Sequence, residues 1–336
     1  MDSLTHVALG AAVGMAVLRR RTAPWKAALW GAVAGTLPDL DVLVDHGDPI
    51  LDMVLHRAES HALFWLTLAS PLLTALVVAV HREQAHWRAW WLALWLALVT
   101  HPLLDALTVY GTQLALPFSN RPFGVGSVFI IDPLVTLPWL AGAAWALAAR
   151  GSTAGLRANA IGLALGGAYL AWGLAAQAIV TQRAQAALQP QGIVAERLLV
   201  TPAAFSSLLW RVVAVSGAQY HEGFHSLLDA PEPIAFDRFE RGAALDEQFR
   251  ANADVQRIRD FSRGLYKLHA AGERVVVADL RMGVEPDYTF AFAVAERGPP
   301  PRPLAPPQAV GRRPDLVRAW PWLWRRTLGD PLPPPR

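Results

Sequence analysis

The sequence predicts an α-helical polytopic membrane domain of about six helices, followed by a small α+β extramembrane domain. Apolar residues make up 53% of the 336 residues and charged residues only 17%, whereas soluble proteins carry about a quarter charged residues. Apolar stretches fill the chain up to about residue 181, and short alternating segments follow from about residue 187. The 14 Trp residues also favour a membrane protein, because Trp concentrates at membrane interfaces.

The membrane domain is expected over residues 1–181. Its apolar stretches are roughly residues 4–18, 25–44, 62–80, 87–107, 128–149 and 158–180. A helix needs about 20 residues to cross the hydrocarbon core, which the third and sixth stretches reach easily. The others reach it only by including ionisable side chains, and the first could be a partly inserted helix. Ionisable groups in such helices normally face a cavity or a partner.

The remaining chain is expected to form an α+β domain over residues 187–297, then a Pro-rich linker and a Trp/Arg-rich tail over 298–336. The expected strands are Ile193–Val200, Leu208–Val215, Gln219–Leu227, Arg274–Leu280 and Tyr288–Ala295, with a possible helix at Leu245–Arg259. Residues 298–313 are expected to be irregular. The segment Ala319–Arg326 fits either a membrane-surface segment or packing on the soluble domain.

Lys and Arg positions predict the orientation of the membrane domain. The basic connections contain Arg19–Arg21 with Lys26, Arg82 with Arg88, and Arg150 with Arg157. These connections are therefore expected to be cytoplasmic. The N-terminus, loops 45–61 and 108–127, and everything after residue 180 are then expected on the periplasmic or exterior side. The arginines follow the first apolar run, which does not resemble a cleaved signal peptide.

Composition also limits the chemistry. A net charge of +3 without a basic aromatic stripe argues against nucleic acid as a partner. The chain has no Cys, so a bound metal must be held by His nitrogen or carboxylate oxygen. Such ligands fit a divalent ion, with zinc expected and manganese or iron as alternatives.

The candidate ligands gather at one end of the predicted helices. They are His6, Asp39, Asp41, His61, His101 and Asp105. Because the topology was assigned from Lys and Arg alone, this one-sided placement is independent evidence for a metal site.

The spacing of individual candidates leaves alternatives open. His101 and Asp105 are four residues apart and share a helical face. Asp39 and Asp41 are two apart and would need Pro38 to loosen the backbone; a solvated helix end is the alternative. Taken singly, His61 is typical of an interfacial residue and His6 of a helix start.

Further residues were assigned possible roles around the ion. His56 could be a ligand or a general acid, while Asp41 and His6 could either complete a second metal site or orient the first ligands. Arg57 could bind an anionic oxygen, as could Arg121, although Arg also anchors helices at interfaces. Asp132 is expected to be a helix N-terminal charge in preference to a residue that supports the ligands.

Several short motifs in order resemble the YdjM-like inner-membrane metal-dependent hydrolases. The motifs are Thr5-His6 with Gly10 and Gly14, Gly35-Thr36-Leu37-Pro38-Asp39-Leu40-Asp41, His56-Arg57 with Ser60-His61, His101-Pro102-Leu103-Leu104-Asp105, and Thr108 with Gly111. The resemblance spans roughly residues 1–135. It implies a multi-pass protein of the bacterial inner membrane with a bound metal and hydrolase activity.

Three functions fit the sequence. A metal-dependent hydrolase would use the ion to generate hydroxide from water and attack a lipid-linked or membrane-proximal ester or phosphoester. An ion-coupled transporter would also use intramembrane carboxylates, but the polar residues stay at one end of the helices. A non-catalytic scaffold would use the ion to hold helices together in a closed shell of ligands.

Overall fold

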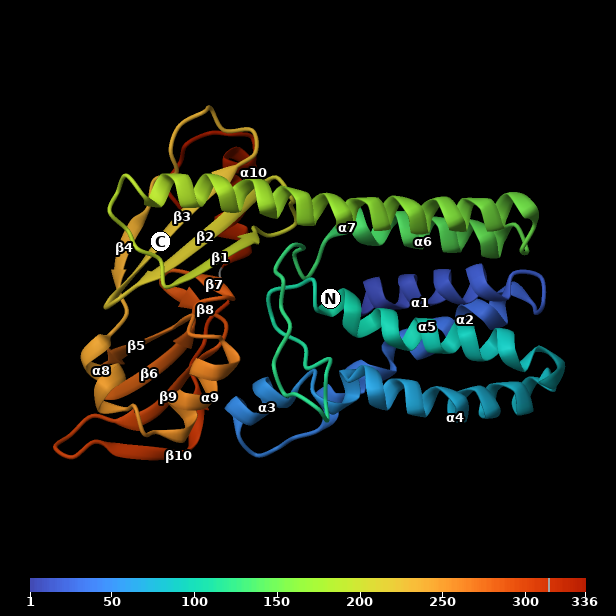
Figure 1. Ribbon diagram of the computed structural model, residues 1–336, viewed down its shortest axis with the longest axis horizontal. Coiled ribbons are helices and arrows are strands. Elements are labelled where there is room, and N and C mark those ends of the chain that lie inside the picture. The colour runs from blue at the N-terminus through green and yellow to red at the C-terminus, as the bar shows by residue number, and fades with distance from the viewer. Residues whose placement is uncertain (314) are drawn as a thin grey trace. The chain divides into compact units, whose positions relative to one another are not determined.

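The computed structural model describes residues 1–313 and 315–336, and the chain divides into two compact units (Figure 1). The helical unit contains residues 1–44 and 56–173. The C-terminal unit contains residues 45–55 and 174–336. The overall organisation, a helical region followed by an α+β domain with antiparallel sheets, confirms the predicted fold class at this level.

The helical unit is built from consecutive helices. Its elements are α1 (Ser3–Leu18), α2 (Pro24–Thr36), the 3-10 helix η1 (Leu37–Leu43), η2 (Glu59–His61), α4 (Leu63–His81), η3 (Gln84–His86), α5 (Trp87–Asp105), α6 (Pro133–Ala148) and the first part of α7 (Thr153–Leu188). A long connection over residues 106–132 joins α5 to α6. Among the described residues, α4 and α7 are long and apolar enough to cross a membrane, and α1 and α6 are shorter apolar helices.

Two of the predicted apolar stretches contain less α-helix than expected. The second was expected to run to residue 44, but α2 ends at Thr36 and the chain continues as η1. Pro38 is responsible in part, because proline donates no backbone hydrogen bond. The fifth becomes helical only at Pro133. There the Asp132 carboxylate accepts a hydrogen bond from the backbone N–H of Leu134 at 3.0 Å, so Asp132 is the helix N-cap.

Glycines allow α1 and α2 to approach closely. A Cβ atom on Gly10 would collide with the backbone carbonyl oxygen of Gly31, and one on Gly14 with that of Ala27. A Cβ on Gly35 would lie 2.8 Å from the carbonyl oxygen of His6. Small residues spaced by four are typical of such close helix pairs in membranes. This contact places the start of α1 against the end of α2, where the candidate ligands lie.

The outer face of α4 remains apolar and exposed within its own unit. Leu68, Leu72, Leu76 and Val80 are all exposed, at a spacing of four residues. The opposite side of α4 contributes Leu66, Val77 and Val78 to the helical core. An exposed apolar stripe on such a helix is what a bilayer would cover.

The C-terminal unit contains two antiparallel sheets and a short hairpin. The first sheet has the order β1 (Arg197–Pro202), β2 (Leu209–Ser216), β3 (Gln219–Ser226), β4 (Asp237–Glu240). The second has the order β10 (Arg302–Ala309), β9 (Ala291–Glu296), β6 (Arg274–Asp279), β5 (Tyr266–Ala271), while β7 (Gly283–Val284) pairs with β8 (Asp287–Tyr288). The helices are α3 (Pro49–Leu55), α8 (Ala243–Gln248), α9 (Ala253–Phe261) and α10 (Leu316–Thr327).

The end of α7 belongs to the C-terminal unit because it packs on the first sheet. Ala176, Val180 and Ala184 form one buried cluster with Trp210 and Val212 of β2. Small side chains on the helix leave room for the large Trp210 ring, which is fully buried. The helix therefore continues beyond the apolar stretch that the sequence suggested, to Leu188.

Three features differ from the sequence-based expectations. Residues 298–313 were expected to be irregular, but they contain β10, which pairs with β9. Proline is compatible with β10 because this strand lies at the edge of its sheet. The helix expected at Leu245–Arg259 is two helices, α8 and α9, and the strands β4, β5 and β7 were not expected.

Candidate metal centre

Four of the predicted ligands converge in the helical unit. They are Asp39 from η1, His61 from η2, and His101 with Asp105 from α5. Each offers one donor atom, and these atoms all lie within 4.8 Å of one another. The cluster could therefore hold a metal ion. His6 and Asp41, also predicted as ligands, lie beside it and contact its members through other atoms.

The distances between donor atoms match the geometry of a small divalent ion. His61 Nε2 lies 3.1 Å from His101 Nε2, and Asp105 Oδ2 is 3.4 Å from both nitrogens. Asp39 Oδ1 is 3.7 Å from His61 Nε2 and 3.4 Å from His101 Nε2. Tetrahedral coordination with bonds of about 2.0–2.1 Å separates neighbouring donors by about 3.3–3.4 Å. The two nitrogens and two oxygens could therefore hold a small divalent ion.

Hydrogen bonds orient both imidazole rings so that Nε2 faces the centre. His101 Nδ1 donates to the carbonyl oxygen of Gly35 at 2.6 Å, which leaves Nε2 without a proton. Ser60 Oγ donates to Asp41 Oδ2 at 2.7 Å and can therefore accept from His61 Nδ1 at 2.8 Å. Such outer partners are typical of histidines that bind metal.

Asp39 and Asp41 lie on opposite sides of the same imidazole. Asp39 approaches His61 Nε2, whereas Asp41 Oδ2 lies 3.4 Å from His61 Nδ1. The change from α2 to the 3-10 helix η1 allows this arrangement. Asp41 therefore has the contacts of a residue that positions His61, and Asp39 has those of a ligand.

The two carboxylate oxygens of Asp105 have different surroundings. Its buried Oδ2 accepts no hydrogen bond from the described residues, although both imidazole Nε2 atoms are nearby. Its Oδ1 lies 3.2 Å from His6 Nε2 and 3.3 Å from Arg57 Nη2, and it contacts the amino group of Met1. An unsatisfied buried carboxylate oxygen is costly, and a cation at the centre would compensate for it.

His6 supports the centre through stacking and through Asp105. Its ring stacks on that of His101 with centroids 3.7 Å apart. Its buried Nδ1 has no hydrogen-bond partner within the part of the chain that the structure describes. His6 therefore borders the cluster without belonging to the set of converging donors.

His56 and Asp41 form a polar pair at the more open side of the cluster. His56 Nδ1 lies 2.9 Å from Asp41 Oδ1. The His56 side chain is 27% exposed and that of Asp39 is 21% exposed, whereas His61, His101 and Asp105 are at 0%. A proton could therefore pass between His56 and solvent, which the buried histidines do not permit.

Arg57 is a buried cation beside the cluster. Its side chain is 3% exposed, its Nη1 donates to Thr108 Oγ1 at 3.3 Å, and its guanidinium lies over the Tyr110 ring at 4.9 Å. Its Nε has no hydrogen-bond partner among residues 1–313 and 315–336. Arg57 has a positive φ of 67°, which is uncommon for a residue with a side chain. Its backbone N–H donates to Asp41 Oδ2 at 2.9 Å, which holds the turn in place.

Two other predicted residues lie elsewhere. Arg121 is exposed on the connection between α5 and α6, and its backbone N–H donates to Ser119 Oγ at 3.3 Å, outside the cluster. Asp132 caps α6 and accepts a hydrogen bond from Tyr169 Oη at 2.9 Å. Sequence reasoning missed the Gly35 carbonyl, Thr108 and Tyr110 as supports for the centre. Only the motif spacing around Gly35 and Thr108 could have indicated the first two.

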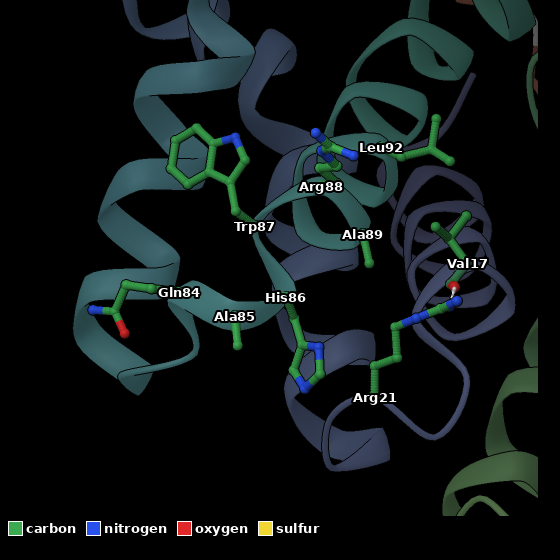
Figure 2. A pocket seen from close by; sticks show the side chains of 9 residues that line it. All are labelled: Val17, Arg21, Gln84, Ala85, His86, Trp87, Arg88, Ala89 and Leu92. Carbon is green, nitrogen blue, oxygen red and sulfur yellow. Dashed lines mark hydrogen bonds between the residues drawn. The ribbon is translucent and has the colours of Figure 1, made fainter.

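A separate pocket of about 660 Å³ lies between the end of α1 and the start of α5, at the other end of these helices from the metal cluster. Figure 2 shows Arg21, His86 and Arg88 around this pocket, together with Trp87. Val17 of α1 and Leu92 of α5 complete the apolar side. No carboxylate lines this pocket, so it does not resemble the metal cluster. The helical unit therefore has an acidic and histidine-rich end and a cationic end.

The fold and the buried cluster define a helical membrane protein with a potential metal site. Residues 1–184 match the sequence model of the family described as "YdjM inner membrane protein", and the chain belongs to this family. It is 26% identical over 176 residues to the uncharacterized protein YfhP of Bacillus subtilis strain 168, covering 51% of this chain and 53% of YfhP. The chain thus spans about half the length of that relative. No solved structure matches.

Proposed function

We propose that this protein is a membrane-embedded metal-dependent hydrolase. Asp39, His61, His101 and Asp105 would hold a divalent ion, with zinc as the first choice. Such an ion supplies a nucleophile at neutral pH by lowering the pKa of water, and it polarises a phosphoryl or carbonyl oxygen. The donor types of these four residues, the distances between their donor atoms and the hydrogen bonds that orient them support this assignment.

The position of the Arg57 guanidinium favours a catalytic ion over a purely structural one. A buried guanidinium 3.3 Å from a ligand carboxylate would repel a divalent ion. An anionic substrate oxygen between the two cations would relieve that repulsion. The unused Nε of Arg57 offers a donor for this oxygen. A phosphoester is therefore the preferred substrate class, since it carries the negative charge that a carboxylic ester lacks.

The pair formed by His56 and Asp41 is suited to proton transfer. Asp41 accepts at His56 Nδ1 and so leaves Nε2 of His56 for the reacting groups. The partial exposure of the His56 side chain allows it to exchange a proton with water. We assign His56 as the general acid that protonates the leaving oxygen, and Asp41 as the residue that orients it.

Exposed apolar residues beside Asp39 and Asp41 support a lipid-linked substrate. Leu40, Val42, Leu43 and Val44 are all exposed within their unit. They would contact the hydrocarbon part of a substrate whose phosphoester reaches the cluster. A soluble substrate would need no such apolar border.

The apolar core between the two ends of the helices argues against a transport pathway. Met15, Leu18, Leu94 and Leu98 fill this region of the helical unit. Polar candidates remain at one end, whereas an ion pathway would continue across the bundle.

The cluster and the C-terminal unit are proposed to face the periplasm or exterior, with about six helical segments in the membrane. Residues 45–55 pack within the C-terminal unit through contacts of α3 with α9 and β10. That loop and that unit therefore lie on the same side of the bilayer. A reporter fused after residue 190 should be active only in the exterior compartment; a cytoplasmic signal would overturn this topology.

Metal content and hydrolysis test the proposal together. The purified wild-type protein, prepared without chelators, should contain about one or more divalent ions per chain. It should also hydrolyse a chromogenic phosphodiester that carries an acyl chain. His101→Ala and Asp105→Ala should abolish both properties without preventing membrane insertion. His86→Ala, at the opposite end of the helices, should retain both. A wild-type protein without metal, or full turnover by Asp105→Ala, would refute the proposal.

A further inference from the structure

The helix α10 has one face that is packed within the C-terminal unit. The ring of Trp322 contacts that of Phe224 edge-on, with centroids 5.0 Å apart. Arg326 forms an ion pair with Asp229, and its Nη2 donates to the carbonyl oxygen of Phe224 at 2.8 Å. These contacts fix the rotation of α10 about its own axis and determine which residues face outward.

The outward face of α10 is an apolar stripe. It consists of Val317, Trp320, Trp324 and Leu328, which are between 54% and 86% exposed. Their spacing of three, four and four residues places them along one side of a helix. Exposure of two Trp rings on one face is unusual for a surface in contact with water only.

Positive charge lies along one side of this stripe. Residues 311–336 contain six Arg and two Asp, a net charge of +4, of which Arg326 and Arg336 pair with Asp229 and Asp237 outside this segment. Arg318 and Arg325 are seven residues apart, so they follow one border of the stripe. Arg312 and Arg313 are exposed just before the helix. An apolar stripe that is bordered by Arg complements a surface that is both apolar and anionic.

We propose that α10 docks through this stripe on the surface of an anionic bilayer. Trp prefers the headgroup region, and anionic lipids attract the Arg residues. The twelve residues of α10 extend about 18 Å, which is too short to cross a core of about 30 Å. The helix would therefore lie in the plane of the interface. Because the chain belongs to an inner membrane protein family, the C-terminal unit is tethered to a bilayer.

The experiment uses the full chain in lipid nanodiscs and a single introduced cysteine. The chain contains no Cys, so Val317→Cys provides a unique site for a nitroxide label on the exposed face. Glu273→Cys, in the exposed turn between β5 and β6, is the matched control. Electron paramagnetic resonance compares accessibility to oxygen, which enters lipid, with accessibility to a water-soluble nickel complex. The discs contain phosphatidylcholine alone or with phosphatidylglycerol.

Docking predicts that the label at 317 becomes accessible to oxygen and shielded from nickel when phosphatidylglycerol is present. The label at 273 should remain accessible to nickel in both lipids. Arg318→Glu in the Val317→Cys chain should weaken docking by at least about fivefold, which corresponds to about 1 kcal/mol for each Arg near an anionic surface. Trp324→Ser should weaken it as well, because it removes an apolar ring from the stripe.

Two results would overturn the proposal. Equal nickel accessibility of the labels at 317 and 273 in anionic discs would show that the stripe remains in water. Shielding of 317 from both reagents, retained in detergent, would instead show that a protein surface or a second copy of the chain covers the stripe.

Discussion

The Nε2 atoms of His61 and His101 lie 3.1 Å apart, while the Nδ1 atom of each ring is engaged by a different partner. Two unprotonated nitrogens at this distance repel each other through their lone pairs. A shared cation would remove that repulsion and would also satisfy Asp105 Oδ2.

Removal of metal should therefore destabilise the helical unit. Dialysis against a chelator is expected to lower the midpoint of thermal unfolding, and returning zinc should restore it. At a zinc concentration about 100 times the dissociation constant, the gain is about 2.7 kcal/mol. Scanning fluorimetry in detergent measures the shift, with His101→Ala as a variant that should not respond. An equal response of wild type and His101→Ala would place the metal elsewhere.

Substitution of Arg57 should separate catalysis from metal binding. Arg57→Ala is expected to lower turnover of a phosphodiester by about 10²–10³-fold, because it removes a donor to the developing negative charge. Metal content should not fall, since Arg57 is not a ligand. Arg57→Lys should recover part of the activity. Steady-state kinetics with elemental analysis measures both properties.

Arg121→Ala is the control for Arg57, because Arg121 is exposed and lies outside the cluster. It should retain wild-type turnover. Loss of metal on substitution of Arg57 would instead indicate a structural role for this residue.

Substitution of His56 should remove a proton-transfer step. His56→Ala is expected to lower the maximal rate by about 10²–10⁴-fold. Asp41→Asn should lower the rate as well, because the amide cannot hold the His56 Nδ1 proton in the same way. The control is His46→Ala, since His46 forms a similar pair with Asp52 at 3.0 Å in the other unit. An unchanged maximal rate in His56→Ala would exclude the acid role.

The close pairing of α1 and α2 should be sensitive to a single methyl group. Gly10→Ala is expected to cost about 1–3 kcal/mol, because the new Cβ would collide with the Gly31 carbonyl oxygen, which the backbone holds in place. It should also lower metal content, since α1 carries His6. Metal content and unfolding in a mild detergent measure the effect.

Gly167→Ala is the matched control, because a Cβ there meets no atom within 4 Å. It should stabilise the chain by about 0.5–1 kcal/mol through the better helix propensity of Ala. Equal effects of the two substitutions would contradict the proposed packing role.

The C-terminal unit should lose stability as the pH falls below about 6.5. Burial lowers the pKa of His225. The positive charges of Arg183 and Arg326 lower this pKa further, and Asp229 opposes the shift only in part. The unfolded chain therefore binds a proton at a higher pH than the folded chain, and the stability lost on acidification is fully present above the unfolded pKa.

His225→Gln should reduce this acid-dependent loss. The fall in unfolding midpoint between pH about 7.5 and about 5 should be smaller in the variant than in the wild type. Circular dichroism of the strands measures it. An identical fall in both proteins would exclude His225 as the titrating group.

The pattern of apolar stretches and of Lys and Arg was enough to predict a helical membrane region and a separate α+β domain. It also placed His61, His101, Asp39 and Asp105 at one end of the helices, because helix periodicity and chain direction are local properties. The order of the short motifs was enough to predict the family, which the match over residues 1–184 confirms.

Tertiary structure decided which of these residues contact the centre and which support it. Sequence spacing treated Asp39 and Asp41 as equivalent, but the 3-10 helix η1 turns one to His61 Nε2 and the other to Nδ1. Burial of Arg57 and the two faces of α10 likewise depend on contacts between residues distant in sequence. Such contacts follow from the packing of whole elements, which local patterns do not encode.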